Sequence, residues 1–390
     1  MSKSLENLVA AVVLQVMASK KWKSVPQIVQ PSGPLPAEPW YDPYEDEREV
    51  PLIGEVIIAY AKEHSHRTRL TAYHVESAIA NFLTSCHLHE HMPIFHITRE
   101  TCKSWRQALL DGTTKRFQGR KANAWTIDRK IRLCAHWLDW CVSQEYLGVN
   151  PMLGLALPKR LVANSKVKKA AFSDVELATI LAAVLKPEVS AHWRASGEPE
   201  RVEFKWIVFC LAFTGARCME VLQLSPVDLR EIEGVLCFDF HRGEGNSLKN
   251  QPSVRVVPVH SQLVTLGFLD WSKTQQGPRL FPLLHPKGSP LVSMWFSRLL
   301  KVIGIKKPSL SLHSLRHTLT VKLAQQRTYP PLQNRLLGHA IGKSVEERTY
   351  MASLTFTPKE LAEAIEKVRL PLELSSTTTE LSSTTTLLLP

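Results

Sequence analysis

The chain has 390 residues, and its 48 lysines and arginines outnumber 36 aspartates and glutamates, which gives a formal charge of +12 at pH 7. This length favours two or three domains. A hydrophobic fraction of 44% suffices for real cores and excludes a wholly disordered basic chain. No apolar run approaches the roughly 18 residues of a transmembrane helix, so no membrane association is expected. The seven scattered cysteines form no CxxC pair, which is typical of a reducing compartment and predicts a cytoplasmic protein.

Both ends of the chain lack the pattern of a folded domain. Six prolines between Pro26 and Pro43 interrupt residues 1–53, which we interpret as an arm of unknown role. Residues 371–390 contain two complete copies of the sequence ELSSTTT and have nothing to pack, so a disordered Ser/Thr-rich tail is expected there. The folded part is therefore predicted between 54 and 370.

Residues 54–157 are predicted to form a helical domain, because apolar residues recur at three- and four-residue steps. The clearest helix runs from Trp125 to Tyr146 and has an apolar stripe on one face. Its other faces carry Arg129, Lys130 and Arg132, which we interpret as candidate contacts to a polyanion. Three tryptophans of this domain, Trp105, Trp125 and Trp137, are expected in the core.

The segment 158–170 is basic and poor in bulky apolar residues, so it is predicted to be a solvated linker between two domains. Its positive residues are Lys159, Arg160, Lys166, Lys168 and Lys169. We interpret these residues as further candidate contacts, placed to run along a phosphate backbone. Ser173 and Glu176 then form a capping box, and a second domain is expected from 171 to 370.

The second domain is predicted to be mostly helical with a small antiparallel sheet. Val235–Phe240 and Val254–Val259 are rich in β-forming residues and flank a long basic loop, which predicts a β-hairpin. Helices are expected from Ser311 to about Gln325, from Pro330 to Gly338, around Tyr350 behind the capping box of Ser344 and Glu347, and from Thr357 to about Arg369.

An arginine at the start of a helix is the first candidate for chemistry in this domain. Gly215 makes a turn before Arg217, and Glu220 lies one helical turn further on. The guanidinium opposes the helix dipole, yet it adds donors for a phosphate at the helix N-terminus. Glu220 can orient this guanidinium, and that is also its ordinary structural role.

Two histidines, an arginine and a tyrosine are further candidates. His313 and Arg316 are three residues apart, which places them near one helix face and suits an anionic substrate. His339 follows two leucines and a glycine, and Tyr350 comes eleven residues later. Each of these features alone also fits an exposed amphipathic helix or a half-buried aromatic residue.

In this order, the motifs together resemble those of the tyrosine recombinases, the phage integrase family. The matching segments are TGARCMEVLQL, the lysine of the hairpin loop, LHSLRH, LLGH and the later tyrosine. The resemblance covers about 171–370, and Lys249 best matches the loop lysine because it lies just before the second strand. The resemblance implies a mainly α fold with a small antiparallel β-sheet, in which a helical core DNA-binding domain precedes a mixed α+β catalytic domain.

The resemblance implies a site-specific recombinase or integrase, for integration or excision of a mobile element. Its substrate would be double-stranded DNA with specific recombination sites, and it would need no metal or other cofactor. Tyr350 would attack the scissile phosphate and form a 3′-phosphotyrosyl intermediate.

Five further side chains have roles in the reaction that the resemblance implies. Arg217 and Arg316 would grip the nonbridging oxygens and neutralise the charge that grows on the phosphorus. His339 would donate a further hydrogen bond. Lys249 would protonate the leaving 5′-oxygen, and His313 would act as the proton shuttle for the tyrosine.

The resemblance also implies partners and an assembly. The two domains would form a C-shaped clamp around the duplex, with the basic residues named above as DNA contacts. A homotetramer on two duplexes is expected, in which Thr357–Arg369 is the helix exchanged between protomers. Accessory DNA-bending proteins are additional candidate partners.

Three alternatives remain open from the sequence. A type IB-like topoisomerase shares this chemistry, and a non-cleaving DNA-binding protein could have kept the fold. The segment from Cys86 to His91 holds one thiol and three imidazole groups that can bind zinc, but its spacing does not match structural zinc sites. We therefore expect no metal site.

Overall fold

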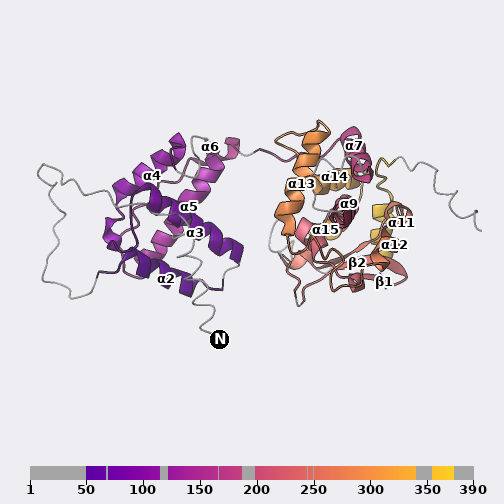
Figure 1. The fold of residues 1–390 in the computed structure, drawn as a ribbon, viewed down its shortest axis with the longest axis horizontal. Coiled ribbons are helices and arrows are strands. Elements are labelled where there is room, and N and C mark those ends of the chain that lie inside the picture. The colour runs from indigo at the N-terminus through magenta and orange to yellow at the C-terminus, as the bar shows by residue number, and fades with distance from the viewer. Residues whose placement is uncertain are drawn as a thin grey trace, which may run out of the picture. The chain divides into compact units, whose positions relative to one another are not determined.

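The computed structural model describes residues 50–66, 69–114, 122–165, 167–186, 198–243, 245–248, 250–339 and 354–372 (Figure 1). Lys166, Lys249 and Tyr350 lie outside the described residues, as do the predicted capping box of Ser344 and Glu347 and nearly all of the arm and the tail. The chain divides into two compact units between Lys166 and Val167, a position within the basic segment 158–170.

The first unit is built from helices around a long central one. Its elements are α2 (Ile53–Glu63), α3 (Arg69–Ser85), η1 (Ile94–His96), α4 (Arg99–Asp111), α5 (Ala124–Ser143) and α6 (Lys159–Ser165). The other α-helices of this unit pack mainly against α5, which begins at the side-chain cap of Asn123. Phe82, Trp105 and Trp137 fill the core that these apolar helix faces enclose.

Three expectations for this part of the chain need correction. Trp125 is 39% exposed, because it lies in the first turn of α5, where its ring contacts the guanidinium of Arg129. Lys130 is only 8% exposed, because it shares the inner face of α5 with Ile127 and Ile131. Residues 159–165, which were expected to belong to a solvated linker, form the helix α6, which packs on α5.

The second unit combines helices with a small sheet. Its elements are α7 (Asp174–Leu185), α9 (Glu198–Thr214), α10 (Cys218–Leu222), η2 (Pro226–Asp228), β1 (Leu229–Ile232), β2 (Val235–Phe240), η3 (Gln251–Ser253), β3 (Arg255–Pro258), α11 (Ser261–Thr265), α12 (Phe268–Lys273), α13 (Gly288–Val302), α14 (Ser314–Gln325), α15 (Pro330–Leu337) and α17 (Pro358–Glu366). The expected fold class, mainly α with a small antiparallel sheet, is confirmed.

The sheet has three antiparallel strands in the order β1-β2-β3. Phe238 pairs with Leu229 on one side and with Val257 on the other, so β2 and β3 form the predicted hairpin. β1 was not expected, since two of its four residues are the charged Arg230 and Glu231. It is joined to β2 by a Glu-Gly turn with both residues at positive φ, a geometry that matches the twist of paired strands.

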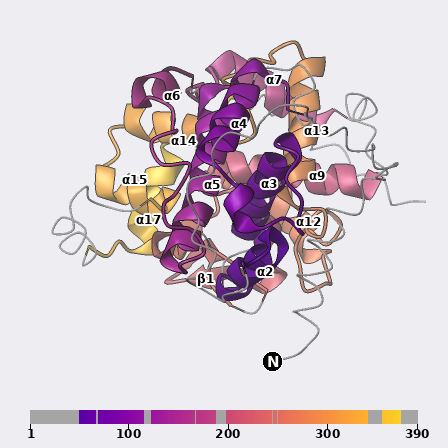
Figure 2. The same cartoon turned by 90° about the vertical axis from the view of Figure 1, so that its left-hand side faces the viewer.

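The helices that carry the candidate residues pack around α9, which is buried over most of its length. α14 contacts both α9 and α15, and Figure 2 shows α14 next to α15. α17 lies against β2 and β3 of its own unit. The predicted capping box at Ser173 is confirmed, the last helix begins at Thr357 as expected, and Gly338 ends α15 at a φ of +67° as expected. Among the described helices, none is long and apolar enough to cross a membrane.

Candidate active site

The turn before Arg217 is fixed by the end of α9. The Thr214 hydroxyl donates to the carbonyl of Cys210 and accepts from the backbone N–H of Ala216, which closes the helix end. Gly215 has a φ of +59°, and a Cβ there would lie 2.7 Å from Cδ2 of Leu337. Only glycine combines this backbone geometry with so close an approach. The predicted Thr-Gly turn is confirmed, and it delivers Arg217 to the start of α10.

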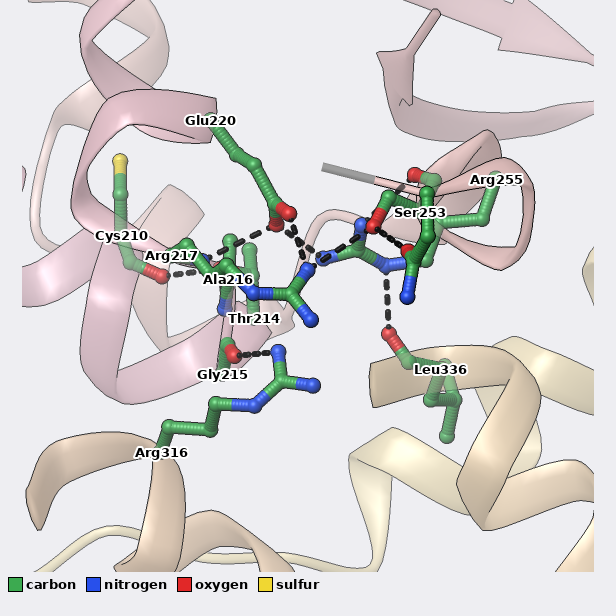
Figure 3. A network of polar contacts seen from close by, with 11 residues as sticks. Cys210, Thr214, Gly215, Ala216, Arg217, Glu220, Ser253, Arg255, Arg316 and Leu336 are labelled. Carbon is green, nitrogen blue, oxygen red and sulfur yellow. Dashed lines mark hydrogen bonds and ion pairs between the residues drawn. The ribbon is translucent and has the colours of Figure 1, made fainter. Parts of the chain in front are cut away.

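Glu220 holds Arg217, as its spacing indicated. Nη1 of Arg217 donates to Oε1 of Glu220 at 2.5 Å and to Oγ of Ser253 at 2.9 Å, while the Arg217 backbone N–H donates to Oε2 at 3.0 Å (Figure 3). The Arg217 side chain is 27% exposed and that of Glu220 only 4%. The guanidinium is therefore aimed by a buried carboxylate and keeps an accessible edge.

Arg255 is the residue of this cluster that the sequence reasoning missed. It is buried, and its Nη2 donates to Oε2 of Glu220 at 3.0 Å. The alternation of buried and exposed residues along β3 could have indicated this burial. Arg255 lies on the same side of the strand as Val257, which is fully buried, whereas Val256 is partly exposed. An arginine on the buried face of a strand indicates a paired charge in the interior.

Arg316 lies at the first turn of α14 and is only 4% exposed. Nη1 donates to the carbonyl oxygen of Gly215 at 2.6 Å, but Nη2 has no hydrogen-bond partner in the described part of the chain. Burial, followed by the positive charges of Arg217 and Arg255, lowers the pKa of Arg316 to about 10, so it stays charged at neutral pH. A buried charged donor without a partner is costly and points to an anionic ligand.

The two histidines lie at element ends rather than on helix faces. α14 begins at Ser314, so His313 is its N-cap residue and not part of a helix that starts at Ser311. His339 follows the end of α15, where its backbone N–H donates to the carbonyl of Asn334. His313 remains accessible to solvent, whereas His339 is half-buried.

Both histidines are neutral at pH 7. Partial desolvation and then repulsion from His317 and Arg316 lower the pKa of His313 to about 4. Burial and then repulsion from Arg316 and Arg217 lower the pKa of His339 to about 4. The two arginines therefore act electrostatically on both rings, which places four of the six predicted catalytic residues in one cluster.

The cluster carries an excess of positive charge. The guanidinium groups of Arg217 and Arg255 both pair with the carboxylate of Glu220, and the charge of Arg316 interacts with all three groups. Burial raises the pKa of Glu220, but Arg255 and then the hydrogen bonds from Arg217 outweigh it, so the net shift is downward and the group is ionised. One negative charge against three positive ones suits a bound anion with one to two negative charges.

The predicted DNA-contact residues occupy a different environment. Arg129, Arg132, Lys159, Arg160, Lys168 and Lys169 are exposed, whereas Lys130 is buried. The Cys86–His91 segment shows no metal cluster: in the described ranges, no three Asp, Glu, His or Cys side chains come together as ligands. Cys86 instead donates to the carbonyl of Thr101, and burial raises its pKa to about 11.

Comparisons with known proteins place this geometry in context. No protein-family profile matches the chain. The tyrosine recombinase XerD of Rickettsia bellii is 23% identical over 303 residues, which are 74% of this chain and 88% of that protein. A solved structure of the Tn1549 transposon integrase in complex with transposon right end DNA is 15% identical with a TM-score of 0.53, over 81% of this chain and 99% of that one. A lambda integrase tetramer bound to a Holliday junction is 17% identical with a TM-score of 0.53, over 75% of this chain and 78% of that one.

Proposed function

We propose that this chain, a distant member of the tyrosine recombinase (phage integrase) family, is a site-specific DNA recombinase that cuts and rejoins DNA through a 3′-phosphotyrosyl intermediate. The observation that carries the proposal is the buried, unpartnered Nη2 of Arg316 beside the guanidinium of Arg217. A cluster with surplus positive charge and a free buried donor fits the phosphodiester of a DNA strand.

In the proposed reaction, the Tyr350 oxygen attacks the scissile phosphorus while the bond to the 5′-oxygen breaks. The tyrosine proton passes to His313, which is neutral at pH 7 and can accept it. Lys249 gives a proton to the leaving 5′-oxygen. A second attack by a 5′-hydroxyl on the phosphotyrosine reverses these transfers and rejoins the strand.

Arg217 and Arg316 are proposed to bind the two nonbridging oxygens of that phosphate. Their guanidinium donors are fixed before the substrate arrives, Arg217 by Glu220 and Arg316 by the Gly215 carbonyl. Such preorganised donors stabilise charge in the transition state without reorganisation. Neutral His339 can donate an additional hydrogen bond to the same oxygens. The guanidinium charges supply the stabilisation that a metal supplies in other phosphoryl-transfer sites, so we propose that no cofactor is required.

DNA binding is proposed to involve both units. Exposed cations at 129, 132, 159, 160, 168 and 169 are candidates for phosphate contacts on the DNA, with Lys166 as a further one outside the described residues. Lys130 is left out because it is buried. A homotetramer on two duplexes is proposed by analogy with the lambda integrase tetramer on a Holliday junction, and service to a mobile element by analogy with the transposon integrase.

Covalent capture tests the proposal directly. The ends of the genetic element that carries this gene supply the candidate site, which is built as a duplex with a nick just beyond the scissile phosphate. The nick lets a short strand diffuse away and traps the covalent intermediate. We expect a protein–DNA adduct on a denaturing gel, formed equally well in excess EDTA. Sequence-specific binding without any adduct would instead indicate a DNA-binding protein that kept the fold.

A further inference from the structure

Arg255, the first residue of β3, has a guanidinium that is enclosed by protein. The residue is 2% exposed, and its Cζ lies 4.5 Å from the centre of the Phe240 ring. In Figure 3 the group lies between Glu220 and the carbonyl of Leu336. Such a group does not reach a DNA substrate, so any part it has in the reaction must pass through its neighbours.

The donors of Arg255 connect three segments that are far apart in sequence. Nη2 donates to Oε2 of Glu220 on α10 at 3.0 Å, and Nη1 donates to the carbonyl of Ser253 at 2.8 Å. Nε donates to the carbonyl of Leu336 on α15 at 2.9 Å. Leu336 is three residues before His339, and Ser253 accepts from Arg217 through its hydroxyl.

The end of α15 is shaped around this guanidinium. Gly338 has a φ of +67°, and a Cβ at that position would lie 3.0 Å from Nη1 of Arg255 and 3.2 Å from its Cζ. The backbone that leads into His339 therefore passes directly over the arginine. A change in the position of Arg255 would move this backbone as well as Glu220.

The charge of Arg255 also keeps Glu220 ionised. Glu220 is buried, and burial by itself raises the pKa of a carboxyl group; Arg255 is the charge that opposes this effect most strongly. An ionised Glu220 accepts from Arg217 through both of its oxygens. A protonated Glu220 would lose much of this attraction, and Arg217 would no longer be held in one orientation.

We propose that Arg255 is a positioning residue, which holds Glu220 against Arg217 and ties both to the end of α15 that leads into His339. The inference rests on the proposed function and adds a residue that does not touch the substrate. Arg255 links the two sides of the phosphate site, so that Arg217 and His339 keep a fixed separation.

The variants Arg255→Met and Arg255→Lys test this assignment. Methionine keeps much of the volume but removes all three donors, and lysine restores the charge without the fork that makes three directed bonds. Arg230→Met is the matched control, because Arg230 pairs with Asp239 on the same sheet while its side chain is 59% exposed. Thermal unfolding of each variant establishes that the comparison is made between folded proteins.

The first readout separates rate from binding. With the nicked duplex at saturation, Arg255→Met should lower the single-turnover rate of adduct formation about 100-fold, the scale of a small misplacement of a catalytic group. The DNA dissociation constant should change less than about threefold, because other phosphate contacts carry the affinity. Arg255→Lys should recover part of the rate, and Arg230→Met should match the wild type. Equal losses of rate in Arg255→Met and Arg230→Met would overturn the proposal.

The second readout is a pH profile, which a purely structural role would not change. Without Arg255 the pKa of Glu220 rises, so the rate of Arg255→Met should fall as the pH drops from about 7 to 5, a range in which the wild type stays constant. This extra dependence should disappear in Glu220→Gln/Arg255→Met. The same acid-sensitive loss in the double variant would show that Glu220 is not the mediator and would overturn the proposal.

A third measurement is independent of DNA cleavage. Inorganic phosphate is titrated into the full-length protein by calorimetry, and Arg255→Met should weaken its binding about tenfold, consistent with the loss of one charge-assisted hydrogen bond. If the wild type binds phosphate but never forms an adduct, the proposed function fails, while the positioning role of Arg255 is still measured by this titration. Unchanged phosphate affinity in Arg255→Met would contradict the positioning role itself.

If Arg255→Met does not fold, the same three measurements are made on Arg255→Lys. Wild-type values in all three would contradict the proposal.

Discussion

Buried and exposed cations of this chain differ in how they are held. Arg255 and Arg316 in the second unit are 2% and 4% exposed, and each donates to named acceptors at fixed distances. Arg132 of the first unit has a 55% exposed side chain and forms one ion pair within its own helix. Burying a charge costs several kcal/mol unless it is paired, whereas an exposed ion pair contributes at most about 1 kcal/mol. The buried arginines are therefore suited to fixing the geometry of a site, and the exposed cations are suited to adding positive charge to the surface.

The largest effect should come from the two arginines proposed to bind the phosphate. Arg217→Ala or Arg316→Ala should lower single-turnover cleavage at saturating DNA by roughly two to three powers of ten, the scale of one oxyanion donor. Site binding should fall much less, since other contacts carry it. Substitution by lysine should rescue poorly because an ammonium lacks the planar fork. Gel-shift titration measures the DNA affinity, and quenched assays measure the cleavage rate. A loss confined to affinity would mean that the residue only binds the DNA backbone and has no part in the reaction.

Gly215→Ala should have the next largest effect, which is a loss of stability. The added methyl group meets Leu337 at 2.7 Å and Leu319 at 3.0 Å, and the residue has a φ of +59°. Overpacking and backbone strain together should reduce the free energy of unfolding by about 3 kcal/mol. Gly234→Ala separates the two causes, because Gly234 also has a positive φ but has nothing within 4 Å of the new Cβ.

Urea denaturation of both glycine variants provides the measurement. Gly234→Ala should lose about 1 kcal/mol, the cost of the backbone conformation alone. Equal losses in the two variants would contradict the tight packing of the Gly215 turn against α14 and α15.

A smaller effect is expected on the pH dependence of cleavage. Because the pKa values of His313 and His339 are lowered to about 4, both rings stay neutral down to about pH 5. The ratio kcat/KM, which reports the free enzyme, should therefore show no inflection near the ordinary histidine pKa of about 6.5. It should fall only as the pH approaches 4, where His313 becomes protonated and can no longer accept the tyrosine proton. An acidic limb with its midpoint near 6.5 would mean that one of these rings is fully solvated.

The smallest effects should belong to the exposed cations. Lys159→Ala, Arg160→Ala and Lys168→Ala should each weaken DNA binding and reduce the slope of log K against log salt by about 0.9. Single-turnover cleavage at saturation should stay near the wild-type rate, because none of these residues belongs to the phosphate cluster. Binding isotherms at several salt concentrations test this, and a cleavage defect at saturation would place that residue in the active site.

Local patterns in the sequence predicted much of the fold. The capping box at Ser173, the helix start at Thr357, the Thr-Gly turn at 214–215 and the glycine after α15 all have local physical causes, and each is found where expected. The start of α14 was wrong by three residues, because the Ser311–Ser314 turn precedes the helix. The strand β1 was missed because its short, charged sequence becomes a strand only by pairing with β2.

The buried network was harder to predict than the motif residues. Its partners come from α10, β3 and α15, so no local spacing joins Glu220, Arg255 and Leu336. The burial of Lys130 could have been predicted from the sequence, since Lys130 lies three residues after Ile127 and four before Cys134 on the inner face of α5. Sequence periodicity therefore separates exposed from buried cations, but it does not name the acceptors of the buried ones.

The identity of the nucleophile is the most direct test of the account. Wild type, Tyr350→Phe and Tyr329→Phe are each incubated with the nicked site duplex in excess EDTA. Tyr329 is the matched control, because it is a 55% exposed tyrosine of the same unit that contacts Phe356. We expect the wild type and Tyr329→Phe to form the covalent adduct, and Tyr350→Phe to bind the site without forming one. An adduct that persists in Tyr350→Phe would contradict the proposed chemistry.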